Sequence, residues 1–239
     1  MNNIIANLQV KIFADGADKN GMLEMANKDH IKGLTTNPTL MAKAGIKDYK
    51  AFALDILKEI KSKPISFEVF SDDFKEMEDQ ALEIASWGSD VYAKIPITNT
   101  KRQVSYDLIH NLSSKGVKVN VTAIMTLDQV TKSVEALDSS IAAYISVFAG
   151  RIADTGVDPL PLMQKAVNIL SSKPKSELIW ASPRELLNIF HANSIGCQVI
   201  TVTNDILKKL EFVGRDLDDY SLETVKMFYD DGKKAGLII

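Results

Sequence analysis

Short apolar runs recur along the chain, separated by longer segments in which apolar residues have helical spacing. β-Branched and aromatic residues dominate the short runs, which is typical of buried strands. Helical spacing lies between them, for example at Phe52, Ile56 and Ile60. The pattern predicts eight strands, at 11–15, 31–36, 65–70, 91–97, 117–122, 143–148, 177–181 and 198–203.

The spacing of these runs predicts the fold class. Their centres lie roughly 21 to 33 residues apart, the length of one strand followed by one helix. Eight such units predict an α/β fold, a closed parallel (β/α)8 barrel, which takes about 250 residues. The 239 residues contain no Gly/Ser-rich linker, so we expect one domain over 1–239. Its last part, 216–239, is predicted to be a helical extension that packs on the barrel or on a neighbouring subunit.

Composition narrows the class of protein. The chain is 46% hydrophobic and 25% charged, with a net charge of −3, which argues against general affinity for nucleic acid or acidic membranes. A single cysteine, Cys197, excludes an intrachain disulfide and suits a reducing compartment; we expect it to be packed rather than reactive. The sequence has no recognisable secretory signal and no apolar run of about 18 residues, so we expect a cytoplasmic protein.

One lysine interrupts an apolar strand. In the run 91–97, Val91, Ala93 and Ile95 share one parity and Lys94 has the other. Because alternate residues of a barrel strand point inward, we expect Lys94 to face the interior. Burial disfavours a charged ammonium, and a neutral amine is what Schiff-base chemistry requires. The alternative is a lysine at a strand end that extends its charged group to solvent.

Polar residues take the same inward parity on four other strands. Each has a structural alternative: an aspartate before a glycine can cap a turn, a glutamate can pair with a cation, and small polar groups can fill a barrel with satisfied hydrogen bonds. Together they favour a site at the carboxyl ends of the strands, where barrel enzymes carry their chemistry. These residues are Asp15, Glu68, Asn120, Thr122 and Ser146.

Basic groups follow the sixth and seventh strands. Arg151 comes just after the sixth strand, and Ser182 and Arg184 lie between the seventh strand and the next helix. Hydroxyls and guanidinium groups near helix N-termini bind phosphate well. A single surface arginine usually faces solvent without a function, but two on adjacent loops of one rim favour a phosphate site.

The ordered motifs resemble the transaldolase family from Phe13 to about Leu210. Two blocks are specific in combination, the threonine-threonine-asparagine-proline block and the lysine-isoleucine-proline block. The matching segments are 13–15 (FAD), 33–38 (GLTTNP), Glu68, 94–96 (KIP), 120–122 (NVT), 146–151 (SVFAGR) and 181–184 (ASPR). The length resembles the small-subunit branch, which includes fructose-6-phosphate aldolases, so the resemblance implies a homo-oligomer, a pentamer or decamer.

The resemblance implies catalytic roles at four positions. Lys94 would form the Schiff base with C2 of a ketose phosphate. Asp15 would take the C4 hydroxyl proton, while Glu68 and Thr122 would position a proton-shuttling water. No metal or organic cofactor is implied, because the protonated imine is the electron sink.

The resemblance also implies a binding site for sugar phosphates, the expected partners. Asn37, Asn120 and Ser146 would hold the dihydroxyacetone unit, with Thr35 and Phe148 lining the site. The sugar phosphate would lie against Arg151, Ser182 and Arg184.

Two positions separate the branches of the family. Glu68 and Phe148 favour a transaldolase, because the fructose-6-phosphate aldolases carry glutamine and tyrosine there. Three positions differ from the residues usual in the family, namely Gly16, Trp180 and Pro183. The resemblance therefore does not decide which sugar is the substrate. The alternatives are an aldolase that releases dihydroxyacetone, transfer onto an unusual sugar, and a non-catalytic sugar-phosphate-binding barrel.

Overall fold

A computed structural model of the chain describes residues 3–238. Eight parallel strands pair in chain order and close into a barrel, which confirms the predicted (β/α)8 fold. The strand ends differ from prediction by up to two residues; the fifth strand, for example, starts and ends two residues later. The strands are β1 (Lys11–Asp15), β2 (Ile31–Thr35), β3 (Ile65–Glu68), β4 (Val91–Pro96), β5 (Val119–Ile124), β6 (Ala143–Val147), β7 (Ser176–Trp180) and β8 (Val199–Thr203).

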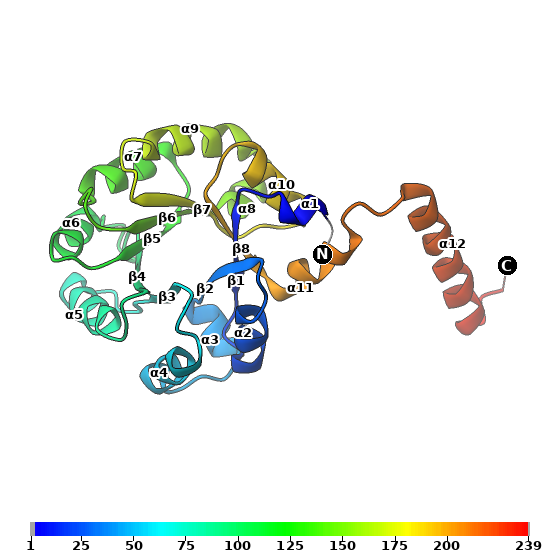
Figure 1. The fold of residues 1–239 in the computed structure, drawn as a ribbon, viewed down its shortest axis with the longest axis horizontal. Coiled ribbons are helices and arrows are strands. Elements are labelled where there is room, and N and C mark those ends of the chain that lie inside the picture. Colours follow the sequence, from blue (N-terminus) through cyan, green and yellow to red (C-terminus); the bar gives the residue numbers. More distant parts are fainter. Residues whose placement is uncertain (1–2, 239) are drawn as a thin grey trace.

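Helices surround the barrel (Figure 1). Several begin at a side chain that accepts a backbone N–H of the first turn, as Asp48, Asp73 and Thr126 do. The helices are α1 (Asn3–Ala6), α2 (Lys19–Ala26), α3 (Pro38–Lys43), α4 (Tyr49–Glu59), α5 (Phe74–Ala85), α6 (Tyr106–Ser114), α7 (Leu127–Ala136), α8 (Ala149–Ala153), α9 (Leu160–Leu170), α10 (Leu187–Ser194), α11 (Asn204–Lys208), the 3-10 helix η1 (Lys209–Phe212) and α12 (Leu217–Lys234).

Two apolar layers stabilise the barrel. The outward residues of the strands pack against helix residues such as Ile56, Met77 and Ala81, all at most 1% exposed. Inside, the lower half of the barrel is filled by the rings of Phe13, Tyr92 and Tyr144 with neighbouring apolar side chains. We call these three residues the aromatic floor. All three residues are at most 7% exposed, so the floor is a packed layer inside the barrel.

Gly33 makes room for this floor. A Cβ atom at Gly33 would lie 2.5 Å from the ring of Phe13, well inside van der Waals contact. The Phe13 ring lies edge-on to Tyr144 at a centroid distance of 5.6 Å, and the rings of Tyr144 and Tyr92 lie 4.3 Å apart with a tilt of 35°. Glycine in this strand therefore allows a large ring from the neighbouring strand to fill the barrel.

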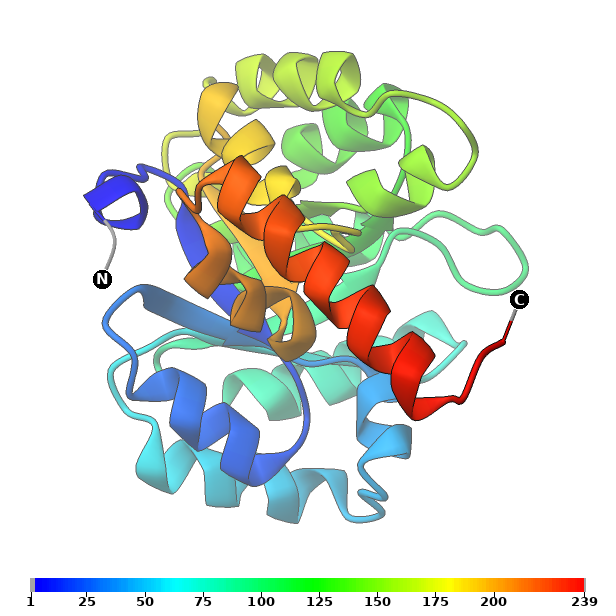
Figure 2. The ribbon, with the colours of Figure 1, turned by 90° about the vertical axis from the view of Figure 1, so that its right-hand side faces the viewer.

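The predicted C-terminal helix is present as α12. It extends away from the barrel beyond α11 (Figure 1) and crosses in front of the barrel when viewed from that side (Figure 2). None of its residues is buried. Leu222, Val225 and Phe228 lie on one stripe and are 51%, 59% and 65% exposed.

The prediction that this segment packs on its own barrel is therefore not met in the single chain, and a neighbouring subunit remains the other predicted partner. Among the helices of residues 3–238, none is both long enough and apolar enough to span a membrane.

Candidate active site

Lys94 lies inside the barrel near the middle of β4, above the aromatic floor. Its residue is 6% exposed, because the pleat turns it inward while Ala93 and Ile95 pack outward. The Nζ atom lies 2.9 Å from Oε2 of Glu68 and donates to the carbonyl of Thr36 at 3.1 Å. The register aligns Glu68 directly with Lys94 across β3 and β4. Parallel pairing therefore places a carboxylate beside the buried amine.

Asp15 ends β1 on the same side of the barrel. Its Oδ1 accepts a hydrogen bond from the Thr35 hydroxyl at 2.7 Å, and the hydroxyls of Thr35 and Thr201 lie 2.5 Å apart. Because Thr35 donates to Asp15, Thr201 donates to Thr35. Burial raises the pKa of Asp15, although the charge of Lys94 and the Thr35 hydrogen bond act in the opposite direction. A carboxylate in this environment binds a proton more readily than an exposed one.

A chain of hydrogen bonds lies one layer deeper. Asn120 donates from Nδ2 to the Ser66 hydroxyl at 3.0 Å, and its Oδ1 accepts from the Ser146 hydroxyl at 2.7 Å. Asn120 is fully buried, and it lies beneath Ser146, which lines the cavity. The amide of Asn120 thus fixes the orientation of Ser146.

Thr122 has a different environment. Its Oγ1 is buried and has no hydrogen-bond partner among residues 3–238. The next residue, Ala123, has a φ of 62°, and the register between β5 and β6 shifts at this point. A left-handed alanine is unfavourable by about 1 kcal/mol or more. This irregularity in β5 leaves the Thr122 hydroxyl available to form a hydrogen bond with a group in the cavity.

The two predicted arginines lie on the rim, where both are exposed. Arg184 forms an ion pair with Asp154, in which its Nε donates to Oδ1 at 2.8 Å. The guanidinium of Arg151 lies 5.8 Å from the ring centroid of Phe148. The Arg184 ion pair lowers the pKa of Asp154, which keeps this carboxylate ionised. Both arginines therefore have protein partners that restrict their side chains.

The loop of Ser182 touches the start of α8. Ser182 has a φ of 58°, and a Cβ atom at Gly150 would lie 1.6 Å from its carbonyl oxygen. Only glycine permits this approach of the two backbones. The contact brings the loops after β6 and β7 together, with Arg151 and Arg184 on neighbouring segments.

A cavity of about 510 Å³ joins these groups. Its walls contain all but one of the predicted site residues; the exception among the described residues is Asn120. Asn37 caps α3 through its side-chain oxygen, which accepts from the Leu40 N–H at 3.0 Å, and it also lines the cavity. The predicted residues in the lining are Asp15, Thr35, Asn37, Glu68, Lys94, Thr122, Ser146, Phe148, Arg151, Ser182 and Arg184.

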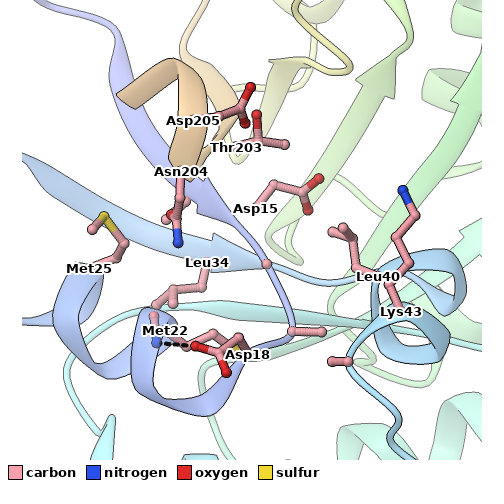
Figure 3. A pocket seen from close by; sticks show the side chains of 15 residues that line it. Asp15, Asp18, Met22, Met25, Leu34, Leu40, Lys43, Thr203, Asn204 and Asp205 are labelled. Atoms are coloured by element: carbon pink, nitrogen blue, oxygen red, sulfur yellow. Dashed lines mark hydrogen bonds between the residues drawn. The ribbon is translucent and has the colours of Figure 1, made fainter. Parts of the chain in front are cut away.

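A second cavity of about 460 Å³ adjoins the first (Figure 3). The two share Asp15, Leu40, Lys43 and Thr203 in their walls. The first cavity has four basic residues and two acidic ones in its lining. The second has one basic residue, Lys43, and three acidic ones, Asp15, Asp18 and Asp205. The two spaces on either side of Asp15 thus have opposite charge.

The residues that departed from the common pattern lie in different places. Gly16 lines the second cavity, and a Cβ atom there would meet nothing within 4 Å. Pro183 lines the first cavity. Trp180 lies on the outward parity of β7, and its ring centroid is 6.4 Å from that of His191 in α10. Unlike Gly16 and Pro183, Trp180 lines neither cavity, because strand alternation directs its ring to the helices.

Sequence reasoning missed several neighbours of the site. Thr201 and Thr203 carry an inward-parity signal on β8 that could have been used, and Ser66 carries the same signal on β3. The contacts of Asp154 and Tyr49 had no such signal, because they join separate loops and helices. Cys197 is buried as expected, and burial raises the pKa of its thiol to about 12. Among residues 3–238, no three His, Cys, Asp or Glu side chains come together as a metal centre.

Comparison with known proteins shows the family of the chain. Residues 12–237 match the transaldolase/fructose-6-phosphate aldolase family. The chain belongs to this family. A probable transaldolase of Thermoanaerobacter sp. (strain X514) is 33% identical over 234 residues, covering 96% of this chain and all of that protein. Probable transaldolase 2 of Listeria monocytogenes is 32% identical over 205 residues, covering 84% of this chain and 88% of that protein. In this transaldolase-family chain, the matched region includes α12 and all of the barrel except Lys11, the first residue of β1.

Proposed function

We propose that the chain is a transaldolase that moves a dihydroxyacetone unit between sugar phosphates through a Schiff base on Lys94. The donor would be sedoheptulose 7-phosphate or fructose 6-phosphate, and the acceptor glyceraldehyde 3-phosphate or erythrose 4-phosphate. One observation carries the proposal. The buried amine of Lys94 lies 2.9 Å from Glu68 in a cavity that also contains Asp15.

Glu68 prepares the amine for attack. It accepts a proton from the Lys94 ammonium, and the neutral Nζ then attacks the C2 carbonyl carbon of the ketose. The carbinolamine loses water when Glu68 returns the proton to the departing hydroxyl, which leaves a protonated imine. Thr122 orients the water molecule that carries protons in these steps, since its hydroxyl has no protein partner among the described residues.

Asp15 controls carbon–carbon cleavage. Its carboxylate removes the C4 hydroxyl proton, the C3–C4 bond breaks, and the electron pair moves into the imine to give an enamine. The aldose phosphate leaves with C4 as its aldehyde carbon. The enamine carbon then attacks the acceptor aldehyde, Asp15 returns its proton to the new hydroxyl, and water hydrolyses the imine. The raised pKa of Asp15 favours both proton transfers, the removal of the C4 hydroxyl proton and the return of a proton to the new hydroxyl.

Ligand contacts follow from the walls of the cavity. Ser146 and Asn37 offer hydrogen bonds to the dihydroxyacetone hydroxyls, and Asn120 orients Ser146 from below. Arg151 and Arg184 take the phosphate on the rim. Asp154 holds the Arg184 guanidinium before the ligand arrives.

Borohydride reduction in the presence of fructose 6-phosphate tests the proposal. We expect a stable adduct on Lys94, located by peptide mass mapping. An adduct on another lysine, or none, would contradict the Schiff-base assignment and would favour a non-catalytic sugar-phosphate-binding barrel.

Product analysis separates transfer from simple aldol cleavage. With fructose 6-phosphate alone, we expect little free dihydroxyacetone, and with erythrose 4-phosphate added we expect sedoheptulose 7-phosphate. Rapid release of dihydroxyacetone without an acceptor would instead identify an aldolase of the fructose-6-phosphate type.

The apolar stripe of α12 supports assembly into a homo-oligomer. An exposed stripe of this kind is unfavourable in water, and a second copy of the chain would cover it. Light scattering of the full chain should give a multiple of 26.4 kDa. Val225→Asp and Phe228→Asp together should shift the particle towards the monomer.

The second cavity favours one further candidate, transfer onto a longer, uncharged acceptor. Asp18 and Asp205 would repel a phosphate there, while hydroxyl groups would find carboxylate and amide partners. Aldehyde acceptors of graded length, each with and without a terminal phosphate, test it. Faster turnover of the longer uncharged aldehydes would support this candidate, and a uniform preference for phosphate would contradict it.

A further inference from the structure

Tyr49, the first residue of α4, contacts the main chain of Glu68. Its hydroxyl accepts a hydrogen bond from the Glu68 N–H at 2.8 Å and donates one to the Glu68 carbonyl at 3.0 Å. One side chain therefore satisfies both backbone groups of the residue that touches the buried amine.

The lengths of β2 and β3 explain why a side chain is needed to pair with the backbone groups of Glu68. In β3 the backbone groups of alternate residues point to opposite neighbours. Ile65, and Val69 just after the strand, donate towards the β4 side, whereas Ser66 accepts from Thr36, the residue that follows β2. Glu68 has the parity of Ser66, so its N–H and carbonyl face β2. But β2 ends at Thr35, where the chain turns into α3. The hydroxyl of Tyr49 takes the place of the strand that has ended.

Aromatic neighbours hold the ring of Tyr49. The centroid of its ring lies 6.3 Å from that of Phe67, 5.5 Å from that of Phe70 and 6.1 Å from that of Trp87. Phe67 directly precedes Glu68 in the chain, Phe70 comes two residues after it, and Trp87 follows α5. Burial raises the pKa of Tyr49, so its oxygen keeps the proton that the second hydrogen bond requires.

We propose that Tyr49 is a positioning residue for the Lys94–Glu68 pair. By fixing the backbone at the last residue of β3, it keeps the Glu68 carboxylate at 2.9 Å from Nζ. Thr36, which follows β2, contacts the same pair, because its carbonyl accepts a hydrogen bond from Lys94. Proton exchange between the amine and a carboxylate depends on this distance, so a loosened strand end slows imine formation. The inference rests on the proposed Schiff-base function.

The test is Tyr49→Phe, which keeps the ring and removes the hydroxyl. We expect kcat to fall about tenfold with little change in KM, because a displaced carboxylate impairs chemistry more than binding. Tyr144→Phe is the matched control. It removes a hydroxyl from the aromatic floor, where the Tyr144 ring contacts the rings of Phe13 and Tyr92, and kcat should stay at the wild-type value.

A double-mutant cycle with Glu68→Gln distinguishes positioning from a general structural effect. Glutamine cannot accept the proton, so Tyr49→Phe should change kcat by less than about twofold in that background. The inference is overturned if Tyr49→Phe leaves kcat unchanged in the wild-type background, or if it costs the same factor in both backgrounds.

Amide hydrogen exchange of the unmutated protein gives a measurement that does not depend on folding of a variant. We expect the Glu68 amide to exchange as slowly as its neighbour in β3, Phe67. An exchange rate like that of an open loop would overturn the inference. The borohydride adduct on Lys94 reports on the proposed function separately, because wild-type protein can form it whether or not Tyr49 has this role.

Discussion

The floor and the mouth of the barrel are built by the same strands, two residues apart. Phe13, Tyr92 and Tyr144 form the aromatic floor. Two positions further along the same strands, with the same inward parity, are Asp15, Lys94 and Ser146. The first three exclude water and stabilise the barrel, while the second three carry polar groups that a packed core would avoid.

The contrast separates floor residues, whose packing stabilises the barrel, from mouth residues, whose presence cannot be explained by a contribution to stability. A buried amine and carboxylates above an apolar floor experience a low dielectric, in which every charge interaction is stronger. Such groups often contribute less to stability than apolar residues of similar size. We therefore expect floor substitutions to lower stability and mouth substitutions to lower activity.

The largest effect should come from Lys94→Met. Without the amine no imine forms, and kcat should fall by roughly 10⁴-fold or more while the fold is retained. Turnover and thermal melting measure the two effects. Lys118→Met is the matched control. Lys118 immediately precedes β5 at the floor end, where its Nζ lies 5.6 Å from the Tyr92 ring centroid, and its loss should leave kcat near the wild-type value. Comparable losses in both variants would contradict the assignment.

The next largest effect should come from Asp15→Asn, which should lower kcat by about 10²- to 10⁴-fold because the proposed general base is lost. Thr35 can still donate to the asparagine oxygen. The raised pKa of Asp15 means that the folded state binds this proton more tightly than the unfolded chain. The stability contributed by Asp15 therefore falls as pH rises from the ordinary aspartate pKa through the raised one.

The asparagine variant should consequently melt at a higher temperature than the wild type near neutral pH, and this advantage should disappear in acid. Melting curves across pH measure it. A variant that is less stable at neutral pH, or equally stable at every pH, would contradict the origin given for the pKa shift.

Phe13→Ala should show the opposite pattern at the floor. Removing a large buried ring beside Gly33 should lower the free energy of unfolding by about 3–5 kcal/mol. Below the melting temperature, kcat should change far less than in Asp15→Asn, although both residues lie on β1. Denaturant unfolding and steady-state kinetics measure the two. Phe13→Leu should lose less stability than Phe13→Ala. If Phe13→Ala lost activity without losing stability, the expected difference between floor and mouth would be contradicted.

Arg184→Ala should have the smallest effect. We expect KM for phosphorylated substrates to rise about 10- to 100-fold, while KM for unphosphorylated aldehydes stays constant, because an exposed guanidinium contributes binding rather than chemistry. Arg184→Lys keeps the charge but loses the forked guanidinium that pairs with Asp154. Its KM for phosphorylated substrates should therefore lie between those of Arg184→Ala and the wild type. Equal changes for both substrate classes would remove Arg184 from the phosphate site.

Much of the site followed from parity. The apolar alternation of β1, β3 and β4 predicts which side of each strand faces inward, and it therefore directs Asp15, Glu68 and Lys94 into one space. The same reasoning applied to Trp180 would have directed it to the helices, as the structure has it. Neither Tyr49 nor Asp154 could be found in this way, since their partners lie on other elements.

By itself, the sequence determined the eight strand-helix units, the inward direction of the polar residues and the family, because these depend on local periodicity and on motifs. Only the tertiary structure decided the distances: the register that aligns Glu68 with Lys94, the early end of β2 that Tyr49 compensates, and the close approach of Gly150 to Ser182. These contacts join residues far apart in the chain, and their geometry depends on how the whole barrel closes.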